Sequence, residues 1–316
     1  GQPFLPFGGL QVILSGDFFQ LPPVSKGLEK AKQVHFSQIW ENMEIRICYL
    51  EEVKRQTDND MVKVLNDIRN QEVGNETAMI VLSRENKEIN GDIKPTKIFT
   101  HNKDVNNLNQ EELDKLKGTS YAYKMVSSGN NILADLLKKG CLAPEKLVLK
   151  KNAVVMFVKN NFEKGYVNGT IGKVIDFDKE TKLPIIKTLS GEGILAEPAS
   201  WEYEEEGEIK ASIKQIPLRL AWAITVHKSQ GMTLDAAEID LSNSFEYGMG
   251  YVALSRLKSL NGLKLLGINE RAFEVDPEIA EFDEELISMS KETEKEFQEM
   301  HWLEKIKRKR KFIRRM

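Results

Sequence analysis

Apolar positions along the first part of the chain predict alternating strands and helices. The run at 10–14 is short, apolar and β-branched, and it ends at Ser15-Gly16-Asp17, which predicts a buried strand that delivers a carboxylate to a loop. Apolar residues then recur at helical spacing at positions 61, 62, 65 and 68, and again at 105, 108 and 116 after a short strand at 97–100. This alternation is typical of an α/β domain.

Between residues 147 and 215 the pattern changes to short strands separated by turn signals. The turn signals are Asn168-Gly169, Asp178-Lys179-Glu180, Ser190-Gly191 and Glu206-Gly207. Such a stretch predicts a small antiparallel barrel inserted in the α/β domain. After it, strands near 237–241 and 263–266 flank a helix at 247–254, and a helical tail follows from 283.

The composition disfavours a membrane-spanning chain, a disulfide-rich chain and a zinc protein. Hydrophobic residues make up 41% and charged residues 29% of the 316 residues. No apolar run approaches the roughly 20 residues that a membrane span needs. Cys48 and Cys141 lack the paired spacing of a zinc site, and the four histidines are scattered. Because the net charge is only −3, any binding of nucleic acid must come from a local surface.

The opening residues resemble no signal peptide, since they lack a basic start and an apolar core. The first residue is Gly1 rather than Met. We therefore expect a truncated chain that works inside the cell, in the cytoplasm or nucleoid, or in the nucleus or a mitochondrion if the source is eukaryotic.

A polar loop directly after the first predicted strand is a candidate nucleotide contact. Its sequence is Gly-Asp-Phe-Phe-Gln-Leu-Pro-Pro-Val at 16–24. Ligands sit at the carboxyl ends of parallel strands, and Gln20 could there donate to a phosphate oxygen while accepting from an attacking water. The alternative is a strand-terminating turn in which Asp17 caps a helix.

Two arginines occupy places where a cation could meet a phosphate. Arg55 lies in Leu-Glu-Glu-Val-Lys-Arg-Gln at 50–56, just before an amphipathic helix, although such a charge run is usually a solvated face. Arg256 ends the apolar run Tyr-Val-Ala-Leu-Ser-Arg, ahead of the strand at 263–266. A guanidinium held there suits the transition-state charge on a γ-phosphate. Alternatively, Arg256 interacts only with the helix dipole at the C-terminal end of the predicted helix.

The most informative segment is Ala-Trp-Ala-Ile-Thr-Val-His-Lys-Ser-Gln-Gly-Met-Thr at 221–233. It places hydroxyls, an imidazole, an ammonium and an amide directly after an apolar run, which is the donor set needed to grip a sugar-phosphate backbone. Gly231 would let the backbone approach a phosphate closely. A lone turn with His227 and Lys228 would more often be an ordinary surface loop, but the ordered string favours binding.

These segments resemble, in the same order, motifs III, IV, V and VI of the Pif/RecD-like superfamily-one DNA helicases. The matching runs are 16–24, 55–56, 225–233 and 251–256, with similar connecting stretches at 100–109, 147–160 and 167–172. The wordings Asp-Phe-Phe-Gln-Leu-Pro-Pro-Val and Tyr-Val-Ala-Leu-Ser-Arg are closest to the Pif-like branch. The resemblance covers residues 8–282.

The resemblance implies an α/β fold of the RecA-like P-loop NTPase class. The expected parts are the end of a first RecA-like core at 1–48, a complete second core at 49–146 and 216–282, a small SH3-like β-barrel inserted at 147–215, and a helical tail with a basic end at 283–316. It also implies ATP-driven translocation along single-stranded DNA with 5′-to-3′ polarity, in repair, recombination or genome and telomere maintenance. Forked DNA and G-quadruplexes are further candidate substrates.

The resemblance also gives roles to individual residues. Gln20, Arg55 and Arg256 would act on the γ-phosphate as catalytic residues, and the nucleotide contacts would be Asp17, Gln20, Arg55, Gln230, Gly231 and Arg256. The DNA contacts would be Thr100, Asn102, Thr225, His227, Lys228 and Thr233. No residue of this chain is expected to bind a metal.

The chain departs from the family in its nucleotide pocket. A Walker A loop needs Gly-x-x-x-x-Gly-Lys followed by Ser or Thr, and the sequence contains no such string. The acidic Mg²⁺-binding motif expected upstream of Gly16 is also absent. We therefore expect that ATP and Mg²⁺ are held mainly by an upstream half of the same helicase, and that this chain alone does not hydrolyse ATP.

Other interpretations stay open at this point. The chain could be a single-strand-binding module whose motor motifs are idle, or the helicase part of a RecD-type or relaxase-type protein. The basic end, from Lys305 to Arg315, is either an extra DNA contact or a solvated, frayed terminus.

Overall fold

The computed structural model describes residues 6–22, 33–43, 45–56, 58–89, 95–188 and 190–313. The chain forms two compact units. The smaller unit combines residues 1–53 with 275–316, and the larger unit comprises 54–274. Each unit is described by itself.

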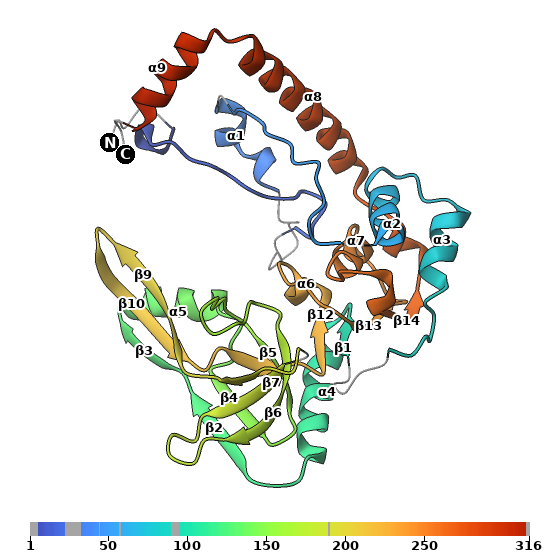
Figure 1. The fold of residues 1–316 in the computed structure, drawn as a ribbon, viewed down its shortest axis with the longest axis vertical. Helices are drawn as coiled ribbons and strands as arrows, with labels where there is room; N and C mark the ends of the chain where they lie inside the picture. Colours follow the sequence, from blue (N-terminus) through green and yellow to red (C-terminus); the bar gives the residue numbers. More distant parts are fainter. Residues whose placement is uncertain are drawn as a thin grey trace. The chain divides into compact units, whose positions relative to one another are not determined.

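The larger unit contains a parallel sheet with the strand order β12-β1-β13-β14 (Figure 1). Its strands are β1 (Thr96–Phe99), β12 (Ala223–Thr225), β13 (Ala237–Leu241) and β14 (Leu263–Ile268). Every neighbouring pair is parallel, and Ile98, Ile224 and Ile239 are completely buried. The strands predicted at 97–100, 237–241 and 263–266 are thereby confirmed.

Helices accompany this sheet, as the α/β pattern predicts. They are α2 (Asn59–Arg69), α3 (Asn75–Leu82), α4 (Asn102–Lys115), α6 (Val226–Ser229) and α7 (Met249–Leu254), with short 3₁₀ turns η3 (Leu260–Gly262) and η4 (Glu270–Phe273). Asp58 starts α2, since its carboxylate accepts from the backbone N–H of Met61 (3.0 Å), and its second oxygen accepts from the N–H of Leu260 (2.7 Å). One carboxylate therefore both begins α2 and joins it to η3.

The edge strand β12 is held from the side by α4. Asn109 on α4 donates through Nδ2 to the carbonyl oxygen of Ala223 (2.8 Å), and the N–H of Ala223 donates back to Asn109 Oδ1 (3.0 Å). Thr96 Oγ1 also donates to the carbonyl oxygen of Ala221 (2.8 Å). Because these groups are buried, the side chains supply hydrogen bonds that the sheet edge would otherwise lack.

Antiparallel sheets lie between β1 and β12 along the chain. Their elements are β2 (Ser120–Lys124), β3 (Val126–Gly129), α5 (Asn131–Gly140), β4 (Lys146–Lys150), β5 (Val154–Phe157), β6 (Ile171–Phe177), β7 (Pro184–Thr188), β8 (Gly193–Leu195), β9 (Ala199–Glu205), β10 (Glu208–Gln215) and β11 (Leu218–Leu220). The sheet orders are β2-β4, β3-β10-β9 and β11-β5-β6-β7-β8. The antiparallel character predicted for 147–215 is confirmed, and it extends outward to β2 and β11. An SH3-like barrel in particular stays a prediction.

The smaller unit contains η1 (Pro6–Gly9), η2 (Val34–Phe36), α1 (Gln38–Asn42), α8 (Pro277–Glu299) and α9 (Trp302–Ile313). The prediction of a buried strand at 10–14 is wrong, because this segment is extended without strand pairing and Leu10 and Ile13 are 76% and 85% exposed. A strand needs a neighbour for its backbone groups, and no strand of the described residues pairs with it. The predicted helical tail is confirmed, with an earlier start that Asp276 caps. In the part of the chain that the structure describes, no helix is long and apolar enough to cross a membrane.

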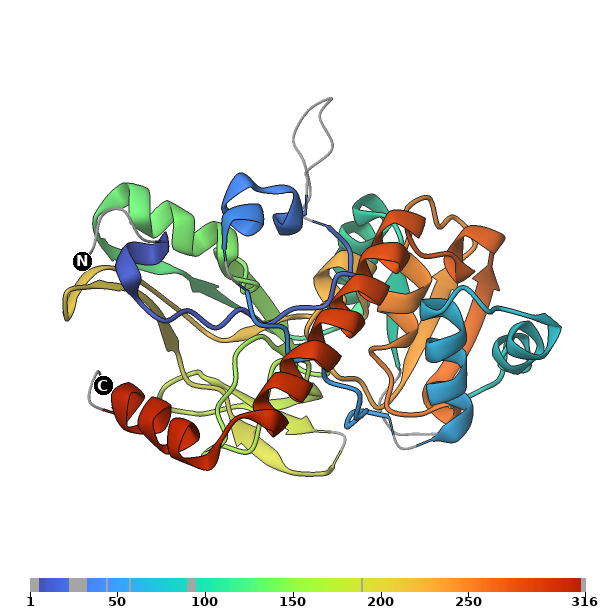
Figure 2. The same cartoon turned by 90° about the horizontal axis from the view of Figure 1, so that it is seen from above.

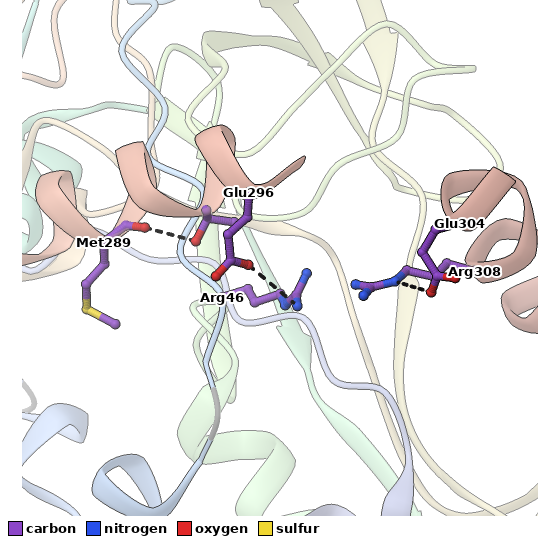
Figure 3. A network of polar contacts seen from close by, with 6 residues as sticks. Arg46, Met289, Glu296, Glu304 and Arg308 are labelled. Carbon is purple, nitrogen blue, oxygen red and sulfur yellow. Dashed lines mark hydrogen bonds and ion pairs between the residues drawn. The ribbon is translucent and has the colours of Figure 1, made fainter. Parts of the chain in front are cut away.

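The segment that follows α1 runs along α8, the long helix near the C-terminal end of the chain (Figure 2). Tyr49 donates its hydroxyl to Asp283 Oδ2 (2.6 Å), and its backbone N–H donates to Ser290 Oγ (3.0 Å). Figure 3 shows a further ion pair, Arg46 with Glu296 at 3.9 Å. Because the Arg46 and Glu296 side chains are largely exposed, their pair contributes little. The buried Asp283 carboxylate makes Tyr49 the stronger anchor.

An aromatic cluster joins the Gln20 turn to the same helix. The ring of Phe18 lies 5.2 Å from that of Phe282, edge to face, and the ring of His35 stacks on Phe282 at 4.3 Å. Burial lowers the pKa of His35, against the raising effect of Glu278. The cluster therefore packs Phe18, two residues before Gln20, against α8.

The close packing of α7 against η4 makes Gly250 a test of this fold. A Cβ on Gly250 would lie 1.9 Å from the carbonyl oxygen of Ala272, a backbone atom that cannot move aside cheaply. We expect Gly250→Ala to lower the free energy of unfolding of the larger unit by about 2 to 3 kcal/mol, measured by urea denaturation. Gly193→Ala is the matched control, since no atom lies within 4 Å of its added Cβ. An unchanged midpoint for Gly250→Ala would contradict the packing.

Candidate nucleic-acid interface

The carboxyl ends of three adjacent strands converge at one edge of the parallel sheet. Because β1 lies between β12 and β13, the loops that leave these strands are neighbours. They are the residues after β1, the turn of α6 after β12, and the loop 242–248 after β13. The predicted DNA contacts on this edge are Thr100, Asn102, Thr225, His227 and Lys228. The structure therefore brings together residues that lie more than a hundred positions apart along the chain.

Two of the predicted DNA contacts have buried hydroxyls. Thr225 is 1% exposed, and its Oγ1 accepts from the backbone N–H of Lys228 (3.3 Å) as the N-cap of α6. Thr100 is 8% exposed, and its Oγ1 lies 2.8 Å from His101 Nδ1. The backbone of Asn102 begins α4. In this arrangement the two threonines orient the side chains that follow them.

The loop 242–248 is connected to both neighbouring loops. Glu246 Oε2 lies 3.5 Å from His227 Nε2, and both side chains are partly buried. The ring of Phe245 lies 5.1 Å from that of His101. The sequence indicated neither Phe245 nor Glu246, because a loop carries no periodic pattern that would single them out.

A second cation, Arg219 on β11, affects Lys228 electrostatically. Lys228 on α6 lies close enough to Arg219 on β11 that the arginine's charge adds to burial in lowering the pKa of Lys228. Burial also lowers the pKa of Arg219, whose Nε is buried without a hydrogen-bond partner among the described residues. Like charges kept together and partly dehydrated are suited to an anion such as a phosphate. The sequence signal for Arg219 was present, since it is the one charged residue in the apolar run 216–226.

The turn after α6 lies against the insertion. Gly231 has a φ of +74°, which favours glycine, and a Cβ there would meet no atom within 4 Å. Gly169, with a φ of +97°, leaves so little room that a Cβ would lie 3.1 Å from Met232 Cβ and 3.3 Å from the backbone N of Thr233. From the sequence, Gly169 indicated only a hairpin turn. The structure shows that this turn packs on the segment expected to bind DNA and nucleotide.

Arg55 connects two of the other motif segments. Its Nε donates to Thr233 Oγ1 (3.2 Å), and its Nη1 donates to the carbonyl oxygen of Ser255 (3.0 Å). Gln56 donates through Nε2 to the carbonyl oxygens of Ser255 (3.1 Å) and Leu257 (2.9 Å). Thr233, a predicted DNA contact, thus accepts a hydrogen bond from Arg55, a predicted nucleotide contact.

Arg256 is 1% exposed and is held against its own helix. Its Nε donates to the carbonyl oxygen of Val252 (2.9 Å), and its Nη2 donates to Ser255 Oγ (2.7 Å). Gln230 follows α6, where its backbone N–H donates to the carbonyl oxygen of His227 (3.4 Å). The segments of Arg55 and Arg256 are therefore adjacent through Ser255, while the Arg256 guanidinium is turned inward.

The Gln20 turn belongs to the smaller unit. Asp17 Oδ1 accepts from the N–H of Phe19 (3.2 Å), and Asp17 Oδ2 accepts from Gln20 Nε2 (3.3 Å). Asp17 therefore caps a tight turn rather than a helix. The last two residues of this predicted motif, Pro23 and Val24, lie outside the described residues. Within the described residues, no group of three or more histidine, cysteine or acidic side chains gathers to hold a metal ion.

The parallel sheet, with polar loops at the carboxyl ends of its strands, defines the class as a RecA-like α/β core. Residues 3–81 match the family described as PIF1-like helicase, and residues 133–177 match the 2B domain of the DNA helicase Pif1. The chain belongs to the Pif1-like helicase family.

Individual relatives agree with this assignment. The ATP-dependent DNA helicase Pif1 of Psychrobacter sp. (strain PRwf-1) is 40% identical over 354 residues, which cover 93% of this chain and 54% of the relative. Bacteroides sp Pif1 in complex with ADP-AlF4 has a TM-score of 0.73 at 30% identity, covering 90% of this chain and 68% of the other. Bacteroides Pif1 bound to ssDNA has a TM-score of 0.60 at 30% identity, covering 91% and 69%. The chain spans about half the length of the curated relatives it matches.

The cation pair predicts a substitution that stabilises the protein. Burial and Arg219 lower the pKa of Lys228 below 10.5, so the folded state bears a cost for its charge at neutral pH. Lys228→Met removes the charge and keeps the shape. We expect the free energy of unfolding to rise by about 1 kcal/mol or less, because the ammonium is partly hydrated.

This gain should depend on pH with a defined sign. Below the lowered pKa both states carry the charge and the cost is complete, whereas above 10.5 both are neutral and it vanishes. The difference between Lys228→Met and the parent chain should therefore shrink as the pH rises through that window, in urea denaturation series. Lys187→Met, on an exposed position of β7, is the control that should change nothing. If Lys228→Met lowered the free energy of unfolding, the charge of Lys228 would not destabilise the folded state and the prediction would be wrong.

Proposed function

We propose that this chain supplies the strand-gripping part of an ATP-dependent DNA helicase that moves 5′-to-3′ along single-stranded DNA. The observation that carries the proposal is the convergence, at the carboxyl ends of the parallel strands, of the loops that carry His101, His227 and Glu246 with the α6 turn of Lys228. These groups offer donors and cations for a phosphate backbone. Solved relatives at 30% identity are described as bound to ssDNA and as a complex with ADP-AlF4, which supports both ligands.

In this proposal the DNA lies across the three strand-end loops. Lys228 and Arg219 neutralise phosphates, and His227 adds a donor whose ring Glu246 orients. Thr100 and Thr225 act by holding these loops in place, since their hydroxyls are engaged within the protein. Asn102 stays a proposed contact at the start of α4. Thr233 couples the grip to the nucleotide through its bond to Arg55.

The nucleotide contacts proposed here suit phosphate oxygens. Arg55, Arg256 and Gln20 are cationic or amide groups, and Gly231 exposes backbone to a close approach. Arg256 would have to rotate away from Val252 to reach a γ-phosphate, so its inward rotamer is a resting state. Asp17 and Gln230 stay proposed nucleotide contacts. ATP supplies the energy for closing and reopening the two motor cores, and the ligands of Mg²⁺ belong to the nucleotide-binding half.

Domain boundaries and location follow from the same proposal. The proposed parts are the end of a first core at 1–48, a second core at 49–146 and 216–282, and an insertion at 147–215. The strands β2, β3 and β11 lie outside the proposed insertion but pair with β4, β10 and β5. Forked DNA is a proposed substrate too, since one solved relative is described at forked dsDNA. The helicase would act wherever the cell keeps its DNA.

Binding of a fluorescent oligo-dT by the purified chain tests the proposal. We expect binding that weakens steeply with salt, and each of Arg219→Gln and Lys228→Met should reduce the slope of log K against log salt by about 0.7. Lys187→Met should leave the slope unchanged. If the chain does not bind oligo-dT, or if neither substitution changes the salt slope, the proposed DNA contacts are wrong.

Turnover distinguishes the helicase from an idle binding module. We expect the chain alone to show no ATP hydrolysis, because it lacks a Walker A sequence. Joined to a nucleotide-binding half from a relative, it should hydrolyse ATP when single-stranded DNA is added, and Arg256→Lys should abolish that stimulation. If the chain alone hydrolysed ATP in a way that depends on Arg256, the proposal that ATP is held mainly by an upstream half would be wrong. If the joined protein did not hydrolyse ATP, a single-strand-binding module without turnover would be favoured.

A further inference from the structure

Phe245 is a large apolar side chain that the fold leaves in solvent. It is 59% exposed, yet it lies in the loop between β13 and α7, at the same sheet edge as the proposed grip. A single exposed apolar residue is ordinary on a protein surface. The position of this one is not, because the aromatic ring of His101 lies beside it with centroids 5.1 Å apart and ring planes at 41°.

The loop that presents Phe245 is braced on both sides of it. Before it, Ser244 Oγ donates to the carbonyl oxygen of Leu241 (3.0 Å), and Asn269 Nδ2 donates to the carbonyl oxygen of Ser244 (2.8 Å). After it, Glu246 meets His227 at 3.5 Å. The loop on either side of Phe245 is therefore anchored, which limits the positions that the ring can take before a ligand binds.

The surroundings of the ring favour a nucleobase over an apolar protein partner. Its neighbours in the loop, Ser242, Asn243 and Glu246, are polar, and Arg271 covers the ring of the other aromatic residue, Tyr247, at 4.3 Å from its centroid. A planar base with a polar rim needs just such a place, with one aromatic face and hydrogen-bonding groups around it. Lys228, in the α6 turn at the same sheet edge, is suited to the phosphates of the same strand.

We propose that Phe245, together with His101, forms a stacking platform for one base of the bound single strand. The proposal rests on the proposed function, and it adds a contact to the bases where Lys228 and Arg219 contact only the backbone. Because every base has a π-face, the platform contributes affinity without sequence preference. It also joins the loops after β1 and β13 through the ligand.

The test compares oligo-dT with an abasic strand of the same length, in fluorescence anisotropy titrations with the full chain. We expect Phe245→Ala to weaken binding of oligo-dT roughly 5-fold or more and to leave binding of the abasic strand unchanged. The salt slope should stay that of the parent chain. His101→Ala should show the same pattern with a smaller loss.

Two further variants separate stacking from burial and from misfolding. Phe245→Trp keeps a π-face and should retain tight binding of oligo-dT, whereas Phe245→Leu keeps apolar bulk alone and should bind like Phe245→Ala. Tyr203→Ala removes a 40% exposed aromatic side chain on β9 and is the matched control, with no expected effect. Should Phe245→Ala fail to fold, the contrast between Trp and Leu decides the question.

The outcomes are distinct from those for the proposed function. Equal losses on oligo-dT and on the abasic strand, or full binding by Phe245→Leu, would overturn the platform and indicate general packing. If Arg219→Gln and Lys228→Met lower the salt slope while Phe245 variants bind as the parent does, the grip stands and the platform fails. If the parent chain binds neither strand, the proposed function itself fails.

Discussion

The parallel pairing of β1 with strands from a distant part of the chain is the constraint on which the site depends. Register pairs Ile98 with Ile224 on one side and with Ile239 on the other, so two late segments are positioned by one early strand. Asn109 completes the arrangement by bonding both backbone groups of Ala223. Without these pairings the three polar loops would have no common edge.

The same pairing explains where the insertion can be. The chain between α4 and β12 must return to the sheet, since β12 lies beside β1, and β11 reaches β5 just before that return. Gly169 then packs against Met232 and Thr233. The insertion therefore contacts the segment that we expect to respond to nucleotide, and a change in either has a direct packing route to the other.

Electrostatics at the strand ends indicates a compromise between stability and binding. Burial and, next to it, the charge of Arg219 lower the pKa of Lys228 and so disfavour the charged lysine. A structural role would be served better by an apolar side chain at either position. A bound anionic strand would neutralise Lys228 and Arg219 and so offset this loss of stability. Functional sites commonly reduce stability in this way.

Much of the fold could be predicted from the sequence, because buried strands and amphipathic helices carry their periodicity locally. The strands β13 and β14 and the buried face of α2 are examples. The failure at 10–14 has the opposite cause, since an apolar run becomes a strand only where a neighbour pairs with it. For the site, ordered motifs made Lys228 and Arg55 candidates, but contacts through space, such as His227 with Glu246 or Gly169 with Thr233, have no signature along the chain.

We propose that one strand of DNA lies across the loops that follow β1, β12 and β13. Hydrogen exchange of the backbone amides, with and without oligo-dT, tests it most directly. Protection concentrated at 100–102, 226–231 and 242–248 is the predicted result. Protection confined to the antiparallel strands or to the basic helix α9, with those three loops unchanged, would contradict it.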